Sequence, residues 1–260
     1  MRGSSPAGCA DRRPRGLRGS SSVGSRVAAV APDDLTGAPL AIVGGTGPLG
    51  RGLATRFAAT GLLVALGSRD PDRAAAAAAQ VADLAGQLAG ADRPGPVTSG
   101  TNADVATAAD VVLVALPWAG HGEALRALEP KLRDRIVVDC VNPLGFDDRG
   151  PYAEVVAEGS AAQQAQALLP RSRVVAAFHH VSAVLLLDPS LAAVETDVLV
   201  VGDDREAADR VASLAGAVPG MRGIIAGRLR NAGQVEALTA NLIAINRRYK
   251  AHAGLRVTDV

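Results

Sequence analysis

A glycine-rich stretch early in the chain has the residue types that hold a phosphate group. Gly45, Gly47 and Gly50 fit the pattern G-x-G-x-x-G, and Gly44, Gly47 and Gly50 fit the looser G-x-x-G-x-x-G. Glycines permit a tight bend and let backbone N–H groups approach a pyrophosphate, which then lies at the positive end of the following helix. Pro48 suits the first turn of that helix, where its missing N–H is not needed. The stretch therefore predicts a dinucleotide-binding turn.

A second polar group lies about 20 residues beyond the glycines, where dinucleotide-binding enzymes contact the adenosine ribose. Enzymes that use NAD usually have an Asp or Glu there, but this chain has Ser68 and Arg69, with Arg73 one helical turn later. A guanidinium group matches the geometry of phosphate oxygens, so these residues favour NADP, which carries a 2′-phosphate. Two alternatives stay open. Asp70 could present a carboxylate to the ribose, and the two arginines could be ordinary surface charges.

Residues for acid–base, nucleophilic or metal chemistry form no recognisable set in the sequence. The histidines come without paired cysteines or an H-x-x-x-H spacing, so we predict no metal site; they stand at positions 121, 179, 180 and 252. Neither Tyr152 nor Tyr249 precedes a lysine by four residues, which excludes the tyrosine–lysine pair of short-chain dehydrogenases. The sequence therefore favours a reaction in which the protein aligns its ligands and supplies no nucleophile.

The elements that would carry these residues alternate between strands and helices. Short apolar runs predict strands at 40–43, 62–66, 97–98, 110–117, 135–139 and 174–178. Helices are predicted between them, at 53–59, 71–88, 118–128 and 160–169. This alternation indicates crossover connections and a doubly wound, mostly parallel α/β sheet of the Rossmann type. Ligands of such sheets bind beyond the carboxyl ends of the strands, where the sixth strand delivers His179 and His180.

The remainder of the chain is smaller and also mixes strands with helices. Residues 146–159 are predicted to be a loop. We predict further strands at 198–201 and around 224–225, with a helix at 205–214. The final helix has an apolar stripe typical of a core or of a subunit contact, formed by Val235, Leu238, Leu242 and Ile245.

The chain divides into three predicted segments. Residues 1–37 are rich in Ser, Gly and Arg and lack a sustained apolar period, which predicts a disordered extension or a translation start placed too far upstream. Residues 38–185 are the predicted NADP-binding Rossmann domain. Residues 186–260 are predicted to be a smaller C-terminal α/β part.

Composition excludes several other classes of protein. Lys and Arg total 27 against 26 Asp and Glu, and a net charge of +1 gives no general attraction to nucleic acid or to an anionic membrane. Aromatic residues make up 2% of the chain, too few for a surface that stacks bases. The chain has only Cys9 and Cys140 and no apolar segment long enough to span a membrane. We therefore expect a cytoplasmic protein whose partners are small molecules.

An ordered set of short motifs resembles one known family. The set comprises Gly44-Gly45-Thr46-Gly47, Gly67-Ser68-Arg69, Leu116-Pro117-Trp118, the strand-end His179 and Leu229-Arg230-Asn231. No single motif is specific, but their order over about residues 38–250 resembles the NADP-dependent coenzyme F420 reductases. The resemblance implies that a Rossmann domain holds NADP and that the C-terminal part completes a pocket for the deazaflavin coenzyme F420. Hydride would then pass between nicotinamide C4 and deazaflavin C5.

The resemblance also implies which residues contact NADP. The pyrophosphate would lie in the glycine turn from Gly44 to Gly50, on Thr46, Gly47, Pro48 and Leu49. The 2′-phosphate would be held by Ser68, Arg69 and Arg73. The nicotinamide and its ribose would lie beside Pro117 and Trp118.

The pocket for the deazaflavin follows from the same resemblance. His179, Val181 and Ala183 would flank the stacked rings, with His179 and Trp118 as positioning residues, and Leu229 would close the pocket. Residues 180–183 read His-Val-Ser-Ala where the family more often has a Thr-Ile-Pro-Ala type of run, a departure that bears on the pocket's shape. Arg228 and Arg230 are also more basic than expected; they could meet the phosphate or oligoglutamate tail of the deazaflavin, or face water.

The function we expect is hydride transfer between NADP(H) and coenzyme F420. One alternative is another NADP-dependent reductase, acting on a small organic substrate such as an imine or a β-hydroxy acid. Such enzymes usually carry a long helical C-terminal domain, for which too few residues follow Ile225. A second alternative is a non-catalytic NADP-sensing protein of the same fold. A homodimer is a further expectation.

Overall fold

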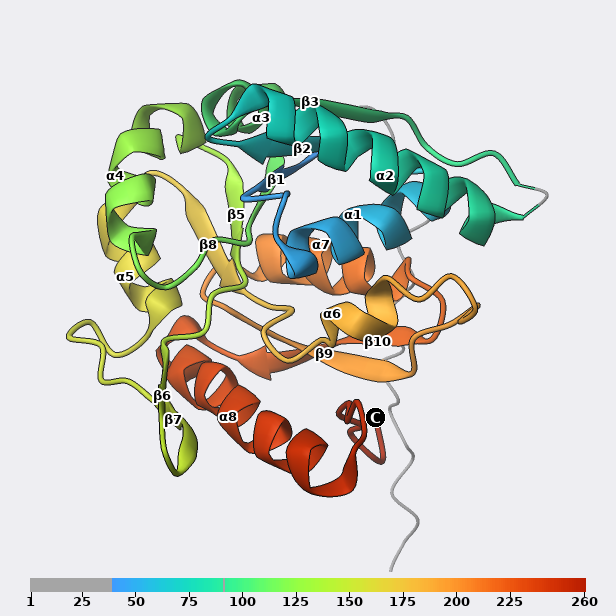
Figure 1. The fold of residues 1–260 in the computed structure, drawn as a ribbon. Coiled ribbons are helices and arrows are strands. Elements are labelled where there is room, and N and C mark those ends of the chain that lie inside the picture. Colours follow the sequence, from blue (N-terminus) through green and yellow to red (C-terminus); the bar gives the residue numbers. More distant parts are fainter. Residues whose placement is uncertain (1–38, 91) are drawn as a thin grey trace, which may run out of the picture.

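A twisted sheet of eight strands forms the centre of the computed structural model, which describes residues 39–90 and 92–260 (Figure 1). The strands lie in the order β10-β9-β8-β5-β4-β1-β2-β3. All neighbours from β8 to β3 are parallel, whereas β9 runs antiparallel to β8 and β10 runs parallel to β9. The prediction of a mostly parallel sheet is confirmed. The strands are β1 (Leu40–Val43), β2 (Val64–Ser68), β3 (Val97–Thr101), β4 (Val111–Val114), β5 (Ile136–Asp139), β8 (Arg173–Ala176), β9 (Thr196–Gly202) and β10 (Met221–Gly227).

The predicted C-terminal part contributes two strands to this same sheet. Both β9 and β10 belong to residues 186–260, and β9 pairs directly with β8 of the preceding part. The central sheet is therefore continuous across the predicted boundary between residues 185 and 186. That the two parts bind different ligands stays a prediction. The predicted extension at residues 1–37 lies outside the described residues.

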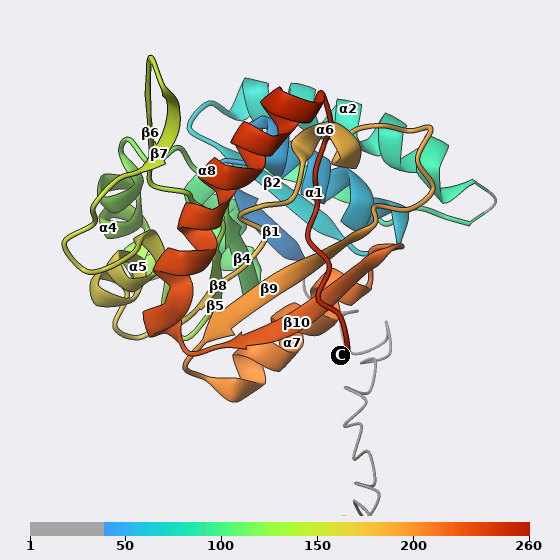
Figure 2. The same ribbon diagram turned by 90° about the horizontal axis from the view of Figure 1, so that it is seen from below.

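Helices cover both faces of the sheet because the side chains of each strand alternate between the faces. Leu40 and Ile42 of β1 pack on one face, and Ala41 and Val43 pack on the other. The first face is covered by α1 (Pro48–Ala59), α2 (Pro71–Ala89), α6 (Ala183–Leu186) and α7 (Arg205–Gly216). The second is covered by α3 (Asn102–Ala108), α4 (His121–Leu132), α5 (Ala161–Leu168) and the first turns of α8 (Ala232–Tyr249) (Figure 2). Among the described helices, none combines the length and apolar character that crossing a membrane requires.

Helix α1 begins at Pro48, earlier than the predicted start at Leu53. Two glycines stay helical within it because other backbone or side chains lie against them. A Cβ on Gly50 would lie 2.8 Å from the Cα of Gly45, and a Cβ on Gly52 would lie 2.7 Å from a side chain of α6. Close packing thus outweighs the low helix propensity of glycine here.

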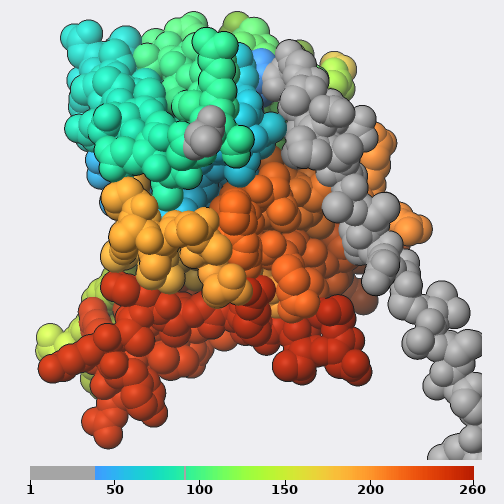
Figure 3. All heavy atoms as spheres, turned by 90° about the vertical axis from the view of Figure 1, so that its right-hand side faces the viewer, coloured from blue at the N-terminus to red at the C-terminus, as the bar shows by residue number. Residues whose placement is uncertain are grey.

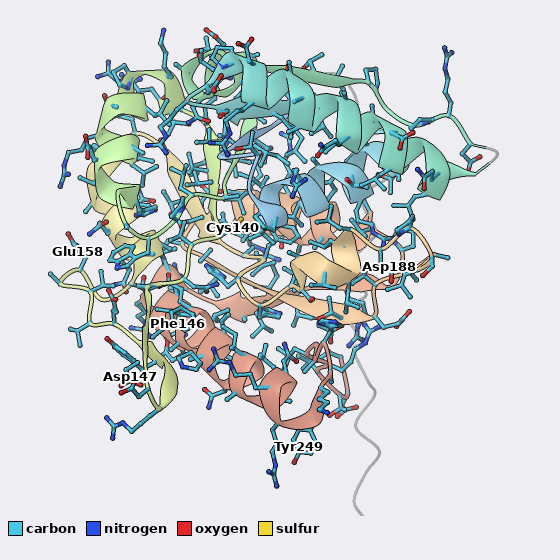
Figure 4. All side chains as sticks on the ribbon, in the orientation of Figure 1. Cys140, Phe146, Asp147, Glu158, Asp188 and Tyr249 are labelled. Atoms are coloured by element: carbon cyan, nitrogen blue, oxygen red, sulfur yellow. The ribbon has the colours of Figure 1, made fainter. Side chains whose placement is uncertain are left out.

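The loop predicted at residues 146–159 was wrong up to residue 153, where the chain forms a β-hairpin, and residues 154–159 contain no strand or helix. Strands β6 (Leu144–Asp147) and β7 (Gly150–Ala153) pair antiparallel in a separate two-stranded sheet. The Asp147 carboxylate closes the turn by accepting the N–H groups of Arg149 and Gly150, at 2.8 and 3.1 Å. Pro151 is tolerated because a two-stranded sheet leaves an unpaired side for a residue without an N–H. Figure 4 labels Phe146 and Asp147 on this hairpin, which contacts α8.

Three helices also differ from the predictions. Helix α4 runs from His121 to Leu132 instead of from 118 to 128, because Gly120 has a left-handed backbone (φ +88°) and Pro130 is accommodated near the helix end. Helices α3 and α6 were not predicted. Helix α3 begins with a capping box between Thr101 and Asp104, a T-x-x-D signal that is readable in the sequence.

The last residues of the chain are fastened to β9 by a buried carboxylate. Asp197 is fully buried and accepts a two-point hydrogen bond from Arg222 (2.7 and 2.6 Å). It also accepts from Arg256 at 2.8 Å and from the N–H of Val257 at 2.7 Å. The Arg222 guanidinium, helped by Val257 and Arg256 and opposed by burial, holds the pKa of this carboxyl well below its usual range.

Asp197→Asn is expected to destabilise the protein by about 1.5–3 kcal/mol at pH 7, the value of hydrogen bonds to a charged group. Because the folded-state pKa is lowered, the carboxylate stabilises the fold above its unfolded pKa of about 3.9, and this contribution is lost as pH falls. Urea unfolding should therefore show a difference between wild type and variant that shrinks below about pH 4. A difference that stays constant down to pH 3 would contradict this role.

Candidate functional site

The glycine turn lies at the carboxyl end of β1, near the middle of the sheet. Gly44 has a left-handed backbone (φ +74°), and a Cβ there would lie 2.7 Å from the carbonyl oxygen of Ala115. Its N–H donates to Oδ1 of Asn102 (3.1 Å), and the N–H of Gly45 donates to the carbonyl of Gly67 (2.9 Å). The turn is therefore fixed to the ends of β2 and β4 and to α3. Only glycine fits at Gly44 without strain.

The turn leaves backbone N–H groups free to bind an anion. Gly47 is the N-cap of α1, and in the described part of the chain no side chain caps this helix end and no acidic residue lies in its first turn. A Cβ on Gly47 would approach nothing closer than the carbonyl oxygen of Gly44 at 3.5 Å, so open space lies above it. Thr46 and Leu49 are half-buried and Pro48 is exposed. An uncapped, glycine-lined helix N-terminus of this kind fits a pyrophosphate.

The end of β2 carries the residues predicted for the ribose and its phosphate. Arg69 and Arg73 are exposed at the start of α2, and Ser68 is buried with its Oγ accepting the N–H of Asp70 (3.2 Å). The carboxylate of Asp70 caps α2 by accepting the N–H groups of Asp72 (3.0 Å) and Arg73 (3.3 Å). The Asp70 carboxylate is thus occupied in capping its own helix, and the guanidinium groups of Arg69 and Arg73 are exposed beside Asp72.

Asn102 is a site residue that the sequence reasoning missed. Its side chain accepts the N–H of Gly44, and a Cβ on Gly67 would lie 2.7 Å from its Oδ1. Asn102 therefore fixes the glycine turn by a hydrogen bond, and its side chain leaves no room for a Cβ at Gly67 near the end of β2. The capping box that opens α3 places Asn102 at the first position of that helix, so recognising the T-x-x-D signal would have located it.

The loop after β4 carries Pro117 and Trp118. Pro117 is exposed, and Trp118 is half-buried with its Nε1 donating to a carboxylate oxygen of Glu154 at 2.9 Å. The indole also lies against the ring of His121, with ring centroids 5.6 Å apart and planes inclined by 38°. Trp118 is therefore held at two points, at the same edge of the sheet as the glycine turn.

His179 follows β8 at this same edge, after Phe178 in a left-handed conformation (φ +64°). Its ring is buried, and neither ring nitrogen has a hydrogen-bond partner among the described residues. Burial lowers the pKa of His179 to about 4, so the ring is neutral near pH 7. Its carbonyl accepts from the Asn142 side chain (2.8 Å) and from the Thr239 hydroxyl (3.2 Å), which ties the end of β8 to α8.

His180 differs from His179 because its ring has a partner. Its Nε2 donates to the carbonyl of Asp197 at 2.7 Å, which fixes it to the first residues of β9. The C-terminal segment reaches the same place, where the N–H of Asp197 donates to Leu255 (2.7 Å). Sequence reasoning did not predict that the end of the chain packs here, because no local pattern marks a tail that binds through separate ion pairs.

The segment after His180 is held by one buried arginine of α1. Val181 is buried and Ala183 is half-buried at the start of α6. The guanidinium of Arg56 donates to the carbonyls that end α6 and the following turn, those of Leu185, Leu186, Asp188 and Leu191, at 2.7–2.9 Å. Figure 3 shows this segment, in yellow-orange, between the N-terminal elements in cyan and the C-terminal residues in red.

Leu229, predicted to close the pocket, lies in a different part of the core from Val181. It is buried in a short 3₁₀ turn (Leu229–Asn231) that contacts α5, β8 and β9, in the core on the opposite face of the sheet from Val181. Because β9 runs antiparallel to β8, the chain leaving β10 emerges away from the edge that carries His179. Arg228 and Arg230, on either side of Leu229, are exposed.

A buried carboxylate joins α8 to the second face of the sheet. Glu236 accepts the N–H groups of Ala161 (2.9 Å) and Ala162 (3.1 Å) at the start of α5, directly after the N-cap residue Ser160. Burial raises the pKa of Glu236 to about 7, against the lowering effect of the two backbone N–H groups. No cluster of His, Cys, Asp and Glu with the arrangement of a metal site occurs in residues 39–90 or 92–260.

Comparison with known proteins gives a consistent set of relatives. The family pattern described as "NADP oxidoreductase coenzyme F420-dependent" matches residues 39–143. The F420-dependent NADP reductase of Methanothermobacter thermautotrophicus is 37% identical over 226 residues, which cover 85% of this chain and 95% of the relative. The corresponding protein of Methanocaldococcus jannaschii is 34% identical, over 85% of this chain and 98% of the relative.

Solved structures agree with this relationship. A crystal structure from an Arthrobacter species, assigned as an F420-dependent NADP reductase, superposes with a TM-score of 0.71 at 27% identity and covers 85% of this chain and all of that one. A pyrroline-5-carboxylate reductase from Coxiella burnetii shares the fold at a TM-score of 0.53 and 15% identity, over 82% of this chain. On the identity and length of its relatives, the chain belongs to the family of F420-dependent NADP reductases.

Proposed function

We infer that this chain transfers hydride between NADP(H) and the deazaflavin coenzyme F420. The relatives that match nearly its whole described length have this activity in their names. The structural observation that supports the inference concerns the edge of the sheet where the parallel strands end. The two ends of this edge carry different kinds of side chain. Within residues 39–90 and 92–260, an uncapped glycine turn and exposed arginines lie at one end, and a buried His179 without a hydrogen-bond partner for its ring lies at the other. The first suits a charged dinucleotide, and the second suits an uncharged ring system.

NADP is proposed to bind along the ends of β1 and β2. The pyrophosphate would lie in the glycine turn, at the N-terminus of α1; this turn comprises Gly44, Gly45, Thr46, Gly47, Pro48, Leu49 and Gly50. The 2′-phosphate would accept hydrogen bonds from Ser68, Arg69 and Arg73. The nicotinamide would lie beside Pro117 and Trp118, since these residues follow β4, the next strand along the sheet.

The bound coenzymes supply the redox chemistry, one as hydride donor and the other as acceptor. The chain's own task is to hold two rings in contact and to exclude water. His179, Val181, Ala183 and Trp118 are proposed as the residues that flank the rings. His179 is neutral near pH 7, so it is suited to shape the pocket or to form a hydrogen bond without exchanging a proton at each turnover.

His179→Gln is expected to impair the step that involves coenzyme F420 while NADPH binding stays normal. A positioning residue aligns a ring, so its loss should raise the KM for F420 or slow hydride transfer modestly, and the pH–rate profile should keep its shape. An obligatory acid or base contributes about 10²–10⁴-fold, and its loss removes one limb of that profile. A missing limb with a large fall in kcat would show that His179 transfers protons.

The function itself is tested by mixing the protein with NADPH and oxidised F420 and following the deazaflavin absorbance. The inference predicts that the deazaflavin band disappears in proportion to the NADPH consumed. A reductase of small organic substrates would oxidise NADPH with an imine or a keto acid and leave F420 unchanged. A nucleotide-sensing protein would bind NADPH without turnover of either.

A homodimer is proposed as the assembly. The observation that supports it is the outer end of the apolar stripe of α8, where the side chain of Ile245 is 40% exposed while Val235 and Leu242 are buried. Light scattering coupled to size exclusion measures the assembly directly, and a mass of one chain at micromolar concentration would contradict the proposal.

A further inference from the structure

A buried histidine beneath Trp118 has a hydrogen-bond acceptor at each ring nitrogen. Nε2 of His121 lies 2.7 Å from a carboxylate oxygen of Asp139, and Nδ1 lies 3.3 Å from Oε1 of Gln164. Both His121 and Asp139 are fully buried. The Gln164 side chain is oriented by its other end, since its Nε2 donates to Glu158 at 3.3 Å. Its oxygen therefore faces the ring of His121.

This arrangement determines the charge of the ring. A carboxylate and an amide oxygen are both acceptors, so both nitrogens of His121 must donate, which only the imidazolium form does. Desolvation would lower the pKa of His121, but the hydrogen bond and charge of Asp139 outweigh it and raise the pKa, helped by Gln164 and by the charge of Glu236. The groups that raise the pKa of His121 thus come from β5, α5 and α8: the Asp139 carboxylate, the Gln164 amide and Glu236, which itself ionises near pH 7.

The imidazolium lies against the indole of Trp118. The ring centroids lie 5.6 Å apart with the planes inclined by 38°, and a cation within about 6 Å of an aromatic ring gives an attraction of about 0.5–2 kcal/mol. The indole Nε1 is held separately by Glu154. One contact holds the indole nitrogen, and the other lies against the indole rings. Gly122, on the same helix as His121, leaves room for the Gln164 side chain, since a Cβ at this position would lie 3.1 Å from Oε1 of Gln164.

We propose that His121, held as an imidazolium by Asp139 and Gln164, is a positioning residue for hydride transfer that fixes the indole of Trp118 at the nicotinamide end of the site. The assignment of this end to nicotinamide rests on the proposed function. The packing of His121 on Trp118 and its charge do not. His121 acts through Trp118 and contacts no reacting atom.

Tryptophan fluorescence tests the proposal without turnover. Trp118 is the chain's only tryptophan, and an imidazolium in contact with an indole quenches its emission more strongly than neutral imidazole does. Over the pH range in which circular dichroism shows the chain folded, wild-type emission should rise with increasing pH, with a midpoint above 6.5. His121→Gln should remove this titration, whereas His252→Gln, which alters an exposed histidine, should leave it unchanged.

A second variant keeps the test decisive if His121→Gln does not fold. Gln164→Leu removes one acceptor and should move the midpoint of the emission change to lower pH, because the hydrogen bond of Gln164 raises the pKa of His121. A wild-type emission that does not titrate above pH 6.5, or a titration that survives His121→Gln, would overturn the proposal.

Kinetics then separate positioning from mere stability. His121→Gln should raise the KM for NADPH or lower kcat by about three- to thirtyfold, matching loss of the indole contact, and leave the KM for F420 unchanged. A purely structural residue would lower the melting temperature with unchanged kinetic constants per folded molecule, and that result contradicts the positioning role. Absence of F420 turnover in the wild type would overturn the proposed function while the fluorescence result still stands.

Discussion

Arg69→Ala is expected to raise the KM for NADPH by about ten- to a hundredfold and to change the KM for NADH little, because a lost hydrogen bond between charged groups costs about 1.5–3 kcal/mol. Arg69 is exposed beside the N-terminus of α2, and the neighbouring Asp70 carboxylate is occupied in capping that helix. The guanidinium is thus available to a 2′-phosphate, which NADH lacks. Initial rates with both nucleotides at fixed F420 give the two KM values.

Arg205→Ala is the matched control for this experiment. Arg205 is an exposed arginine at the start of α7, paired with Asp209 one turn along the same helix, and it lies in no part of the proposed site. Its loss should leave both KM values unchanged. If Arg69→Ala weakened NADPH and NADH equally, Arg69 would be contacting a group common to both nucleotides, and its assignment to the 2′-phosphate would be wrong.

Arg56→Leu is expected to destabilise the protein by about 3–5 kcal/mol, because hydrogen bonds from a charged group contribute about 1.5–3 kcal/mol for each carbonyl that finds no other partner. Arg56 is 3% exposed, and its guanidinium donates to four carbonyls of α6 and the turn that follows it. Burial lowers the pKa of Arg56 and the charge of Asp188 opposes this shift. For a chain of this size the melting temperature should fall by about 6–20 °C. Differential scanning calorimetry measures the change.

The same substitution carries a functional consequence because α6 begins at Ala183 in the proposed deazaflavin pocket. Variants that still fold should show a raised KM for F420 and a normal KM for NADPH. Arg56→Lys keeps the charge but presents a single ammonium in place of the planar fork, so an intermediate loss of stability is expected. An unchanged melting temperature for Arg56→Leu would mean that these carbonyls find other partners at no cost.

The parts of the site that lie on one continuous stretch of chain could be predicted from the sequence. The turn from Gly44 to Gly50 needs backbone conformations and close contacts that only glycine permits, so the glycines in the sequence reveal it directly. The charged residues after β2 could be placed for the same reason, since they follow the glycines at a fixed spacing. His179 could be placed at the sheet edge because an apolar run ends just before it.

The remaining parts depend on contacts between distant segments, which leave no local pattern. His121 lies on a different element from each of its partners, Asp139 and Gln164. The residues next to it in the sequence therefore indicate neither its burial nor its charge. The place of Leu229 in the fold is a similar case. Its position depends on β9 turning antiparallel to β8, and periodicity does not distinguish a parallel from an antiparallel partner for a short apolar strand.

The most direct test of direct hydride transfer uses NADPH labelled with deuterium at the transferring position of nicotinamide C4, with oxidised F420, in ordinary water. The account predicts that the label appears at C5 of the reduced deazaflavin, without dilution by solvent protons, because the two rings are held in contact and no residue exchanges a proton in between. Mass spectrometry of the reduced coenzyme gives the deuterium content. A reduced deazaflavin that carries hydrogen from water at C5 would contradict the account.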